Sequence, residues 1–403
     1  MMKAALLLLC AASTALAQRP RARDLGIPFD GTPGPLNAIT DVAGIEVGHT
    51  TLIQGQGRLE RGRGPVRTGV TAILPRGRAT FDPVFAHWFS LNGNGEMTGT
   101  TWIEESGFLE GPVLITNTHS VGVARDAAIS WLLQRNAQFF WALPVVAETF
   151  DGMLNDINGF HVRPEHVHAA LDAARGGAVA EGSVGGGTGM VCNSFKGGIG
   201  TSSRAVTVQG SRYTVGVLVQ CNYGSRQELR IVGVPVGREI RSVPPPCYDA
   251  PSPPSQPILR FLARCATGGS SSREPSMPEL GSIIIVVATD APLLPHQLRR
   301  LTKRAALGLG REGSIASNGS GDIFVAFSTA NAGAASDSAV ARLQMLPNEH
   351  MDRLFLATVQ ATEEAITNAM LAAETMTGAD GVRVSGLPGQ EVVEILRRYG
   401  RIP

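Results

Sequence analysis

Residues 282–288 read Ser-Ile-Ile-Ile-Val-Val-Ala, an unbroken apolar run that begins with a hydroxyl residue. A run of this length, rich in β-branched residues, is typical of a strand buried on both faces. It follows directly on a proline-rich stretch without clear patterning, which ends at Gly281. The sequence therefore predicts a core strand whose first side chain, Ser282, stands at the boundary between a loop and the core.

The Gly281–Ser282 peptide bond has two interpretations. One is an ordinary boundary between a loop and a strand. In the other, cleavage at this bond frees the α-amine of Ser282 beside its own hydroxyl, so that one residue holds both nucleophile and base. A model α-amine has a pKa of roughly 7.7 to 8.0, so much of it accepts a proton near neutral pH without help from a histidine.

Composition limits the classes of partner. The 403 residues are 43% hydrophobic, which is enough for a large core, and they carry a net charge of +1 with 17% charged residues. Nothing here provides the basic surface that nucleic acids or anionic membranes require. We expect a small-molecule or peptide substrate, and neither a nucleic acid nor a membrane as partner.

Residues 1–17 have the features of a secretory signal peptide. Lys3 precedes an apolar run, and Ala15-Leu16-Ala17 gives the small-residue pattern of a cleavage site before Gln18. The run is too short for a stable membrane anchor, so we expect a periplasmic or secreted protein. The mature chain keeps Cys192, Cys221, Cys247 and Cys265. Such cysteines can pair in an oxidising compartment, and Cys247 with Cys265 is the best candidate pair, with free thiols as the alternative.

Hydrophobic periodicity and turn residues predict an α+β fold, since strands and helices mix without strict alternation. The predicted strands are 45–50, 70–74, 113–116, 145–147, 213–220, 282–288 and 323–327, and the predicted helices are 124–136, 164–174, 295–309, 348–376 and 390–399. Nine of the 25 prolines lie between residues 241 and 281, so we expect this segment to be an exposed connection.

Three further motifs carry polar side chains to strand ends. Ser320 and Asp322 precede a buried strand and share a face if strand geometry has begun, although a capped turn is the alternative. Asn222 ends a strand and is a candidate oxyanion donor, or only a turn former. Glu148 follows an apolar strand and is a candidate for binding a substrate ammonium, with a solvated strand end as the alternative.

Rival chemistries find less support. His161, His166 and His168 lack a metal-binding spacing, so no metal is expected. The glycine clusters at 185–189 and 197–200 match no phosphate-binding motif. Ser320 has Asn318 where a nucleophile elbow requires glycine, so a hydrolase of that type is not indicated.

In their order along the chain, these segments resemble the L-aminopeptidase/D-esterase and β-aminopeptidase family of self-processing N-terminal serine hydrolases. The resemblance spans nearly the whole mature chain. It rests on Gly281-Ser282 with the strand after it and residues 288–293, on 317–322 with 327–329, and on 220–224, 148–156 and 185–200.

The resemblance implies a four-layer αββα sandwich built from one domain, cut into an α chain of residues 18–281 and a β chain of 282–403. It implies homo-oligomers, with a tetramer expected, and no cofactor. Ser282 would be the nucleophile, Ser320 and Asp322 the pair that orients it, Asn222 the oxyanion donor, and Glu148 the carboxylate that binds the substrate's amino group.

One departure from the family concerns Phe150, which stands where a tyrosine is expected. Phenylalanine lines a pocket but donates no hydrogen bond, so any hydroxyl contribution must come from elsewhere, and Tyr223 is the candidate. Losing one oxyanion donor costs about 10²- to 10³-fold in turnover.

The expected activity is that of a secreted aminopeptidase that cuts itself before Ser282 and releases small L-α-, β- or D-amino acid residues from short peptides, amides or esters. Two alternatives stay open. One is an unprocessed protein that binds a peptide or an amine. The other is an acyltransferase related to the ornithine acetyltransferases, although those use threonine as nucleophile.

Overall fold

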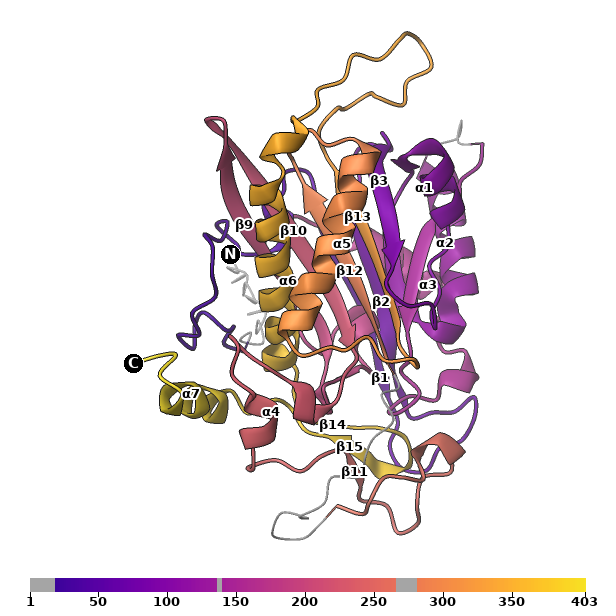
Figure 1. The fold of residues 1–403 in the computed structure, drawn as a ribbon. Helices are drawn as coiled ribbons and strands as arrows, with labels where there is room; N and C mark the ends of the chain where they lie inside the picture. The colour runs from indigo at the N-terminus through magenta and orange to yellow at the C-terminus, as the bar shows by residue number, and fades with distance from the viewer. Residues whose placement is uncertain (1–18, 136–139, 266–280) are drawn as a thin grey trace, which may run out of the picture.

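Two β-sheets packed face to face form the centre of the molecule (Figure 1). The computed structural model describes residues 19–135, 140–265 and 281–403. The four-stranded sheet contains, in spatial order, β1 (Glu46–Gln54), β2 (Val66–Leu74), β5 (Val113–Asn117) and β6 (Val145–Thr149). The six-stranded sheet contains β4 (Phe108–Leu109), β3 (Val84–Ser90), β13 (Gly321–Ser328), β12 (Ser282–Thr289), β10 (Ser211–Asn222) and β9 (Gly198–Val208).

Helices cover the outer face of each sheet. The pairs β5–β6 and β12–β13 are parallel, and parallel neighbours need a crossover connection. Helix α2 (Val121–Arg135) joins the first pair and lies with α3 (Pro164–Asp172) on the four-stranded sheet. Helix α5 (Pro295–Arg311) joins the second pair and lies with α6 (Asp352–Ala372) on the six-stranded sheet. The α+β class and the αββα layering predicted from the sequence are therefore confirmed.

Three apolar cores hold these layers together. One fills the space between the sheets, and the other two lie between each sheet and its helices. The backbone of β9 approaches α6 so closely that a Cβ on Gly200 would stand 2.0 Å from the carbonyl oxygen of Ala365, so only glycine fits there.

Smaller elements close the ends of the sandwich. Around its lower end in Figure 1 lie α4 (Val236–Glu239), α7 (Gly389–Arg398) and the three-stranded sheet β11–β15–β14. Those strands are β11 (Cys247–Tyr248), β15 (Val382–Val384) and β14 (Met376–Thr377). The remaining elements are α1 (Thr100–Ser106) and the hairpin β7 (Val191–Cys192) with β8 (Phe195–Lys196).

The described part of the segment 241–281 is exposed over much of its length, but it is not a connection without structure. This part forms β11, which pairs with β15, and it buries Leu259 and Leu262 against Leu154 and Val384. Residues of this proline-rich stretch therefore contribute to a small core, because tertiary contacts cover side chains that show no periodic pattern. Residues 266–280 lie outside the described residues, as do residues 1–17 of the expected signal peptide.

Two disulfides join the four cysteines of the described residues. Cys247 is joined to Cys265, which confirms the predicted pair, and Cys192 is joined to Cys221. The second bond links the β7–β8 hairpin to the end of β10, a contact that the sequence did not reveal.

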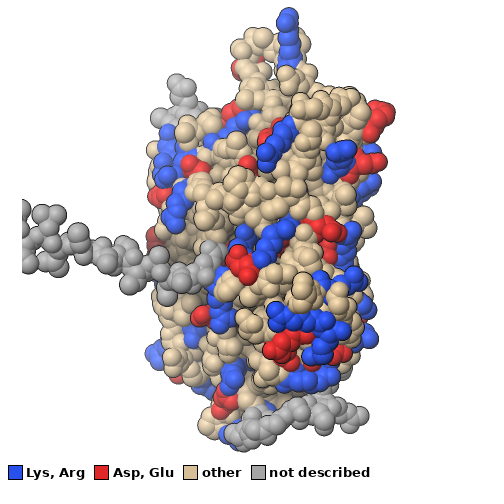
Figure 2. Space-filling view, turned by 90° about the vertical axis from the view of Figure 1, so that its left-hand side faces the viewer, with Lys and Arg blue, Asp and Glu red and all other residues tan. Residues whose placement is uncertain are grey.

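The surface carries charges of both signs. On the face drawn in Figure 2, Lys and Arg side chains are interspersed with Asp and Glu side chains among uncharged residues. Within the described residues, no helix combines the length and apolar character that crossing a membrane requires.

Candidate active site

Ser282 is the first residue of β12, in the middle of the six-stranded sheet. It lies opposite Gly321 of β13 on one side and Asn222 of β10 on the other. Its side chain shares a face with Ile284 and Val286, which belong to the core between the sheets. The hydroxyl therefore lies at the edge of the inter-sheet layer, and the residue is only 4% exposed.

The peptide N–H of Gly321 contacts both partners of the expected self-cleavage. It donates to Ser282 Oγ and to the carbonyl oxygen of Gly281, each at 3.2 Å. Gly281 itself has no room for a side chain, since a Cβ there would stand 1.8 Å from the Asn222 carbonyl oxygen. One backbone donor thus holds the hydroxyl and the carbonyl that it would attack.

The predicted pairing of Ser320 with Asp322 is present. Ser320 Oγ donates to Asp322 Oδ1 at 2.6 Å, and the N–H of Ile283 donates to the same oxygen at 3.2 Å. Burial raises the pKa of Asp322 to about 6, against the lowering effect of these bonds. These bonds hold Asp322 at the backbone next to Ser282; the contact to the Ser282 hydroxyl is made by Gly321.

The Asn222 amide is fixed from two sides. Its Oδ1 accepts from the N–H of Val191 at 2.7 Å, and its Nδ2 donates to the carbonyl oxygen of Phe150 at 2.9 Å. The Cys192–Cys221 disulfide joins the neighbours of Val191 and Asn222. Because Nδ2 carries two N–H groups, the amide retains a second donor for an oxyanion.

Glu148 lies at the end of β6 and is 3% exposed. One carboxylate oxygen accepts from the N–H of Glu96 at 3.0 Å, and the other accepts from the Thr118 hydroxyl. Burial raises the pKa of Glu148, while these two bonds oppose the shift. A buried carboxylate held by two donors can bind an ammonium group strongly, because little water competes.

Sequence reasoning missed the segment 91–96, Leu-Asn-Gly-Asn-Gly-Glu. Asn92 accepts from the N–H of Asp322 at 2.7 Å, and a Cβ on Gly95 would lie 3.3 Å from both Glu148 Oε1 and Gly321 Cα. The segment therefore lies between the Ser282 and Glu148 sites. Its signal was the repeated Asn-Gly after a strand, which resembles an ordinary turn.

Phe150 and Tyr223 lie in different parts of the structure. Phe150 is half-buried beside Glu148, and its ring packs over Gly152. Tyr223 is 1% exposed and packs in the core between the six-stranded sheet and α5 and α6. The proposed place for a Tyr223 hydroxyl beside the substrate is therefore not supported, since this side chain lies on the face of β10 away from the inter-sheet core.

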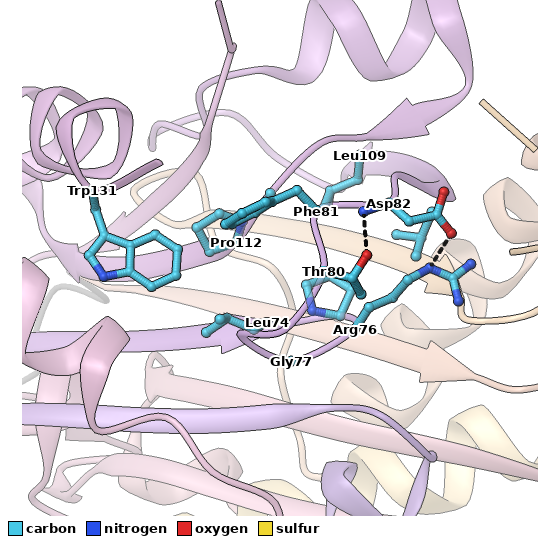
Figure 3. Close-up of a pocket in the computed structure, with 12 residues that line it drawn as sticks. Leu74, Arg76, Gly77, Thr80, Phe81, Asp82, Leu109, Pro112 and Trp131 are labelled. Atoms are coloured by element: carbon cyan, nitrogen blue, oxygen red, sulfur yellow. Dashed lines mark hydrogen bonds and ion pairs between the residues drawn. The ribbon is translucent and has the colours of Figure 1, made fainter. Parts of the chain in front are cut away.

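Other candidate sites lie elsewhere or do not form. A small pocket, drawn in Figure 3, is lined by apolar side chains such as Leu74 and Trp131 and by the ion pair of Arg76 and Asp82. It opens where β2 ends and β5 begins, at the other end of the sandwich from Ser282. Across the described ranges, no group of histidine, cysteine and carboxylate side chains is arranged to hold a metal ion.

Comparison with known proteins assigns the chain. The model of peptidase family S58 matches residues 37–384. The chain belongs to peptidase family S58. It is thereby an N-terminal serine aminopeptidase, and the resemblance stated from the sequence is confirmed.

Relatives of known name support this assignment. The chain is 55% identical to the β-peptidyl aminopeptidase BapA of Sphingosinicella microcystinivorans, over 97% of this chain and 95% of that protein. It is 47% identical to BapA of Sphingosinicella xenopeptidilytica, over 97% of this chain and 94% of that protein.

Solved structures give the same result. The L-aminopeptidase D-Ala-esterase/amidase of Ochrobactrum anthropi, described as a variant of the Ntn hydrolase fold, matches with a TM-score of 0.83 and 46% identity, over 96% of this chain and 100% of that chain. The β-aminopeptidase of a Burkholderia species matches with a TM-score of 0.81 and 45% identity, over 95% of this chain and 100% of that chain.

Proposed function

We propose that this S58 peptidase cuts itself before Ser282 and then uses Ser282 to release small N-terminal residues, of the L-α-, β- or D-configured kind, from short peptides, amides or esters. The observation that carries the proposal is the shared Gly321 donor, which contacts Ser282 Oγ and the Gly281 carbonyl oxygen together. The names of the relatives, β-peptidyl aminopeptidase and D-Ala-esterase/amidase, support the substrate class.

Self-cleavage follows from this contact. Ser282 Oγ attacks the carbonyl carbon of Gly281, and the Gly321 N–H stabilises the oxygen that becomes negative. The C–N bond then breaks as the hydroxyl proton passes to the Ser282 nitrogen, which leaves Gly281 as an ester on Ser282 Oγ and frees the α-amine. Water hydrolyses the ester to the Gly281 carboxylate and restores the hydroxyl.

Substrate turnover uses the Ser282 hydroxyl as nucleophile a second time. Glu148 binds the ammonium of the substrate and thereby sets its first carbonyl beside Ser282. The freed α-amine accepts the proton of Ser282 Oγ as it attacks, and then donates a proton to the leaving amine. The second Asn222 N–H stabilises the oxyanion, and water hydrolyses the acyl-enzyme. No step of this route calls on a cofactor.

Intact mass spectrometry of the purified protein tests the proposal. We expect two chains, 18–281 and 282–403, with Edman sequencing of the second beginning at Ser282. Ser282→Ala should remain one chain without activity. Activity in Ser282→Ala, or full activity in a chain that stays uncut, contradicts the proposal. Addition of hydroxylamine as acceptor distinguishes hydrolysis from acyl transfer.

We further propose that the protein is exported to the periplasm or medium and assembles as a homo-oligomer, with a tetramer expected. The signal-like residues 1–17 and the two disulfides support export. Cell fractionation followed by light scattering of the purified protein tests both statements. A cytosolic protein or a monomer contradicts them.

A further inference from the structure

An exposed aromatic pair lies beside the candidate amine site. His119 belongs to a short 3-10 helix (Thr118–Ser120), and Phe160 follows a second one (Ile157–Gly159). The two rings are stacked, with centroids 5.9 Å apart and an angle of 20° between their planes. Phe160 is nevertheless 64% exposed, so one aromatic face remains open to solvent.

Phe160 is held in an unfavourable backbone conformation. Its φ of 52° and ψ of 50° lie in the left-handed region, which bulky residues rarely adopt. The residues around it are themselves held in place, since Asp156 accepts from the Gly62 N–H at 2.7 Å and lies 2.9 Å from the His161 ring. A strained and exposed phenylalanine next to a site points to a role in that site.

Several contacts connect this pair to Glu148. Thr118, the neighbour of His119, donates its hydroxyl to Glu148. His119 itself lies close enough to Glu148 to oppose, as a minor influence, the rise in the Glu148 pKa that burial causes. The two 3-10 helices pack against each other. Position 152 lies close to both the Phe150 ring and Ile157, so apolar groups continue from Phe150 towards Phe160.

We propose that Phe160, supported by His119, forms the wall that contacts the side chain of the substrate's first residue. This inference rests on the proposed function, since it takes Glu148 as the site of the substrate amine. In α-amino acids, and in β-amino acids substituted at the β-carbon, one carbon carries both the amine and the side chain. A wall beside Glu148 therefore contacts that side chain in both classes.

The test compares substrates with and without a side chain. Phe160→Ala should lower kcat/KM for leucine and β-homoleucine amides by about 10-fold, mainly through KM, because apolar contact is lost. The same variant should turn over glycine and β-alanine amides within about twofold of the unaltered enzyme, as they lack the side chain that the wall contacts. An equal loss for all four substrates, or no loss for any, overturns the proposal.

Two further variants separate this role from a structural one. Phe160→Tyr keeps the ring and should restore turnover of leucine and β-homoleucine amides. Phe140→Ala removes a phenylalanine that is 91% exposed near the opposite end of β6. This variant should leave kcat/KM unchanged for all four substrates. Self-cleavage of Phe160→Ala, read by mass, should be complete. If the unaltered protein is itself uncut and inactive, the proposed function fails, and that outcome differs from a lost side-chain preference.

Discussion

Ser282 and Asn222 lie directly opposite each other, as the first residue of β12 and the last residue of β10. Side chains at directly opposite positions of an antiparallel pair have Cβ atoms about 4.5 to 5.5 Å apart. The register of two buried strands thus sets the amide beside the hydroxyl. Placement of this kind is rigid, because shifting it requires the whole sheet to slip.

The Asn222 amide should act mainly on the chemical step. We expect Asn222→Ala to lower kcat by about 10²- to 10³-fold with little change in KM, since an oxyanion donor acts in the transition state. Asn222→Asp, which keeps the acceptor for Val191 but loses the N–H donors, should show a similar loss. Asn331→Ala in an exposed turn serves as the control and should leave kcat unchanged. A large rise in KM with normal kcat contradicts this role.

Glu148 should govern recognition of the free amine. Glu148→Gln should lower kcat/KM for substrates with a free amino group roughly 10- to 100-fold, because a bond to a charged group is replaced by a weaker neutral one. Self-cleavage needs no amine recognition and should proceed, which mass spectrometry can check. The raised pKa of Glu148 also predicts that kcat/KM increases with pH as this carboxyl ionises. A Glu148→Gln enzyme with unchanged kcat/KM would refute the assignment.

The ionised form of Asp322 should lower the free energy of unfolding, although the residue supports activity. Its folded pKa, raised to about 6 by burial, lies above the ordinary value of 3.8, so the fold favours the neutral form. The folded state then binds more protons than the unfolded state between these values, and stability falls as pH rises through that window.

Asp322→Asn keeps an acceptor and removes the charge. At pH 7 it should raise the free energy of unfolding by on the order of 1 to 3 kcal/mol, and lower activity. Urea unfolding at pH 4 and pH 7 provides the measurement, carried out in the uncut Ser282→Ala chain so that the transition involves one polypeptide. A variant less stable than the parent at pH 7 contradicts this reading.

The buried ion pair of Arg204 and Glu364 should be sensitive to loss of one partner. Both side chains are at most 1% exposed, and Arg23 also pairs with Glu364. Glu364→Leu should cost about 3 to 5 kcal/mol of unfolding free energy, because it leaves the Arg204 charge buried. Glu60→Ala removes an exposed ion pair with Arg63 and should cost no more than about 1 kcal/mol in the same urea experiment. Equal effects of the two changes would argue against the buried charge as the cause.

The sequence predicted the elements that carry a clear period. Helix α5 and strands β12 and β13 appear within a few residues of their expected bounds, because apolar spacing and the flanking proline and glycine mark them. Strand β9 was missed, since its buried part contains Thr201, Ser202, Ser203 and Arg204. Bonds to distant partners such as Glu181 and Glu364 satisfy these polar groups, and periodicity cannot reveal such partners.

The sequence likewise predicted some relations in the candidate site and missed others. Ser320 and Asp322 were paired correctly because they are two residues apart at a strand start. The place of Asn92 was not foreseeable, since it meets Asp322 from 230 residues away. Tyr223 was named because Phe150 lacks a hydroxyl and a substitute donor was sought, whereas strand alternation turns the Tyr223 ring to the helix side of the sheet.

Strands β12 and β13 lie between β3 and β10, so residues from after the expected cut are enclosed on both sides by residues from before it. Cleavage of one bond therefore leaves the two fragments joined within one sheet. Backbone hydrogen bonds link β13 to β3 and β12 to β10. Heating such a protein past its melting point should separate the two fragments. Because no peptide bond joins them any longer, refolding requires two separate chains to associate. We expect the cut enzyme to regain little activity on cooling, whereas the uncut Ser282→Ala chain should refold.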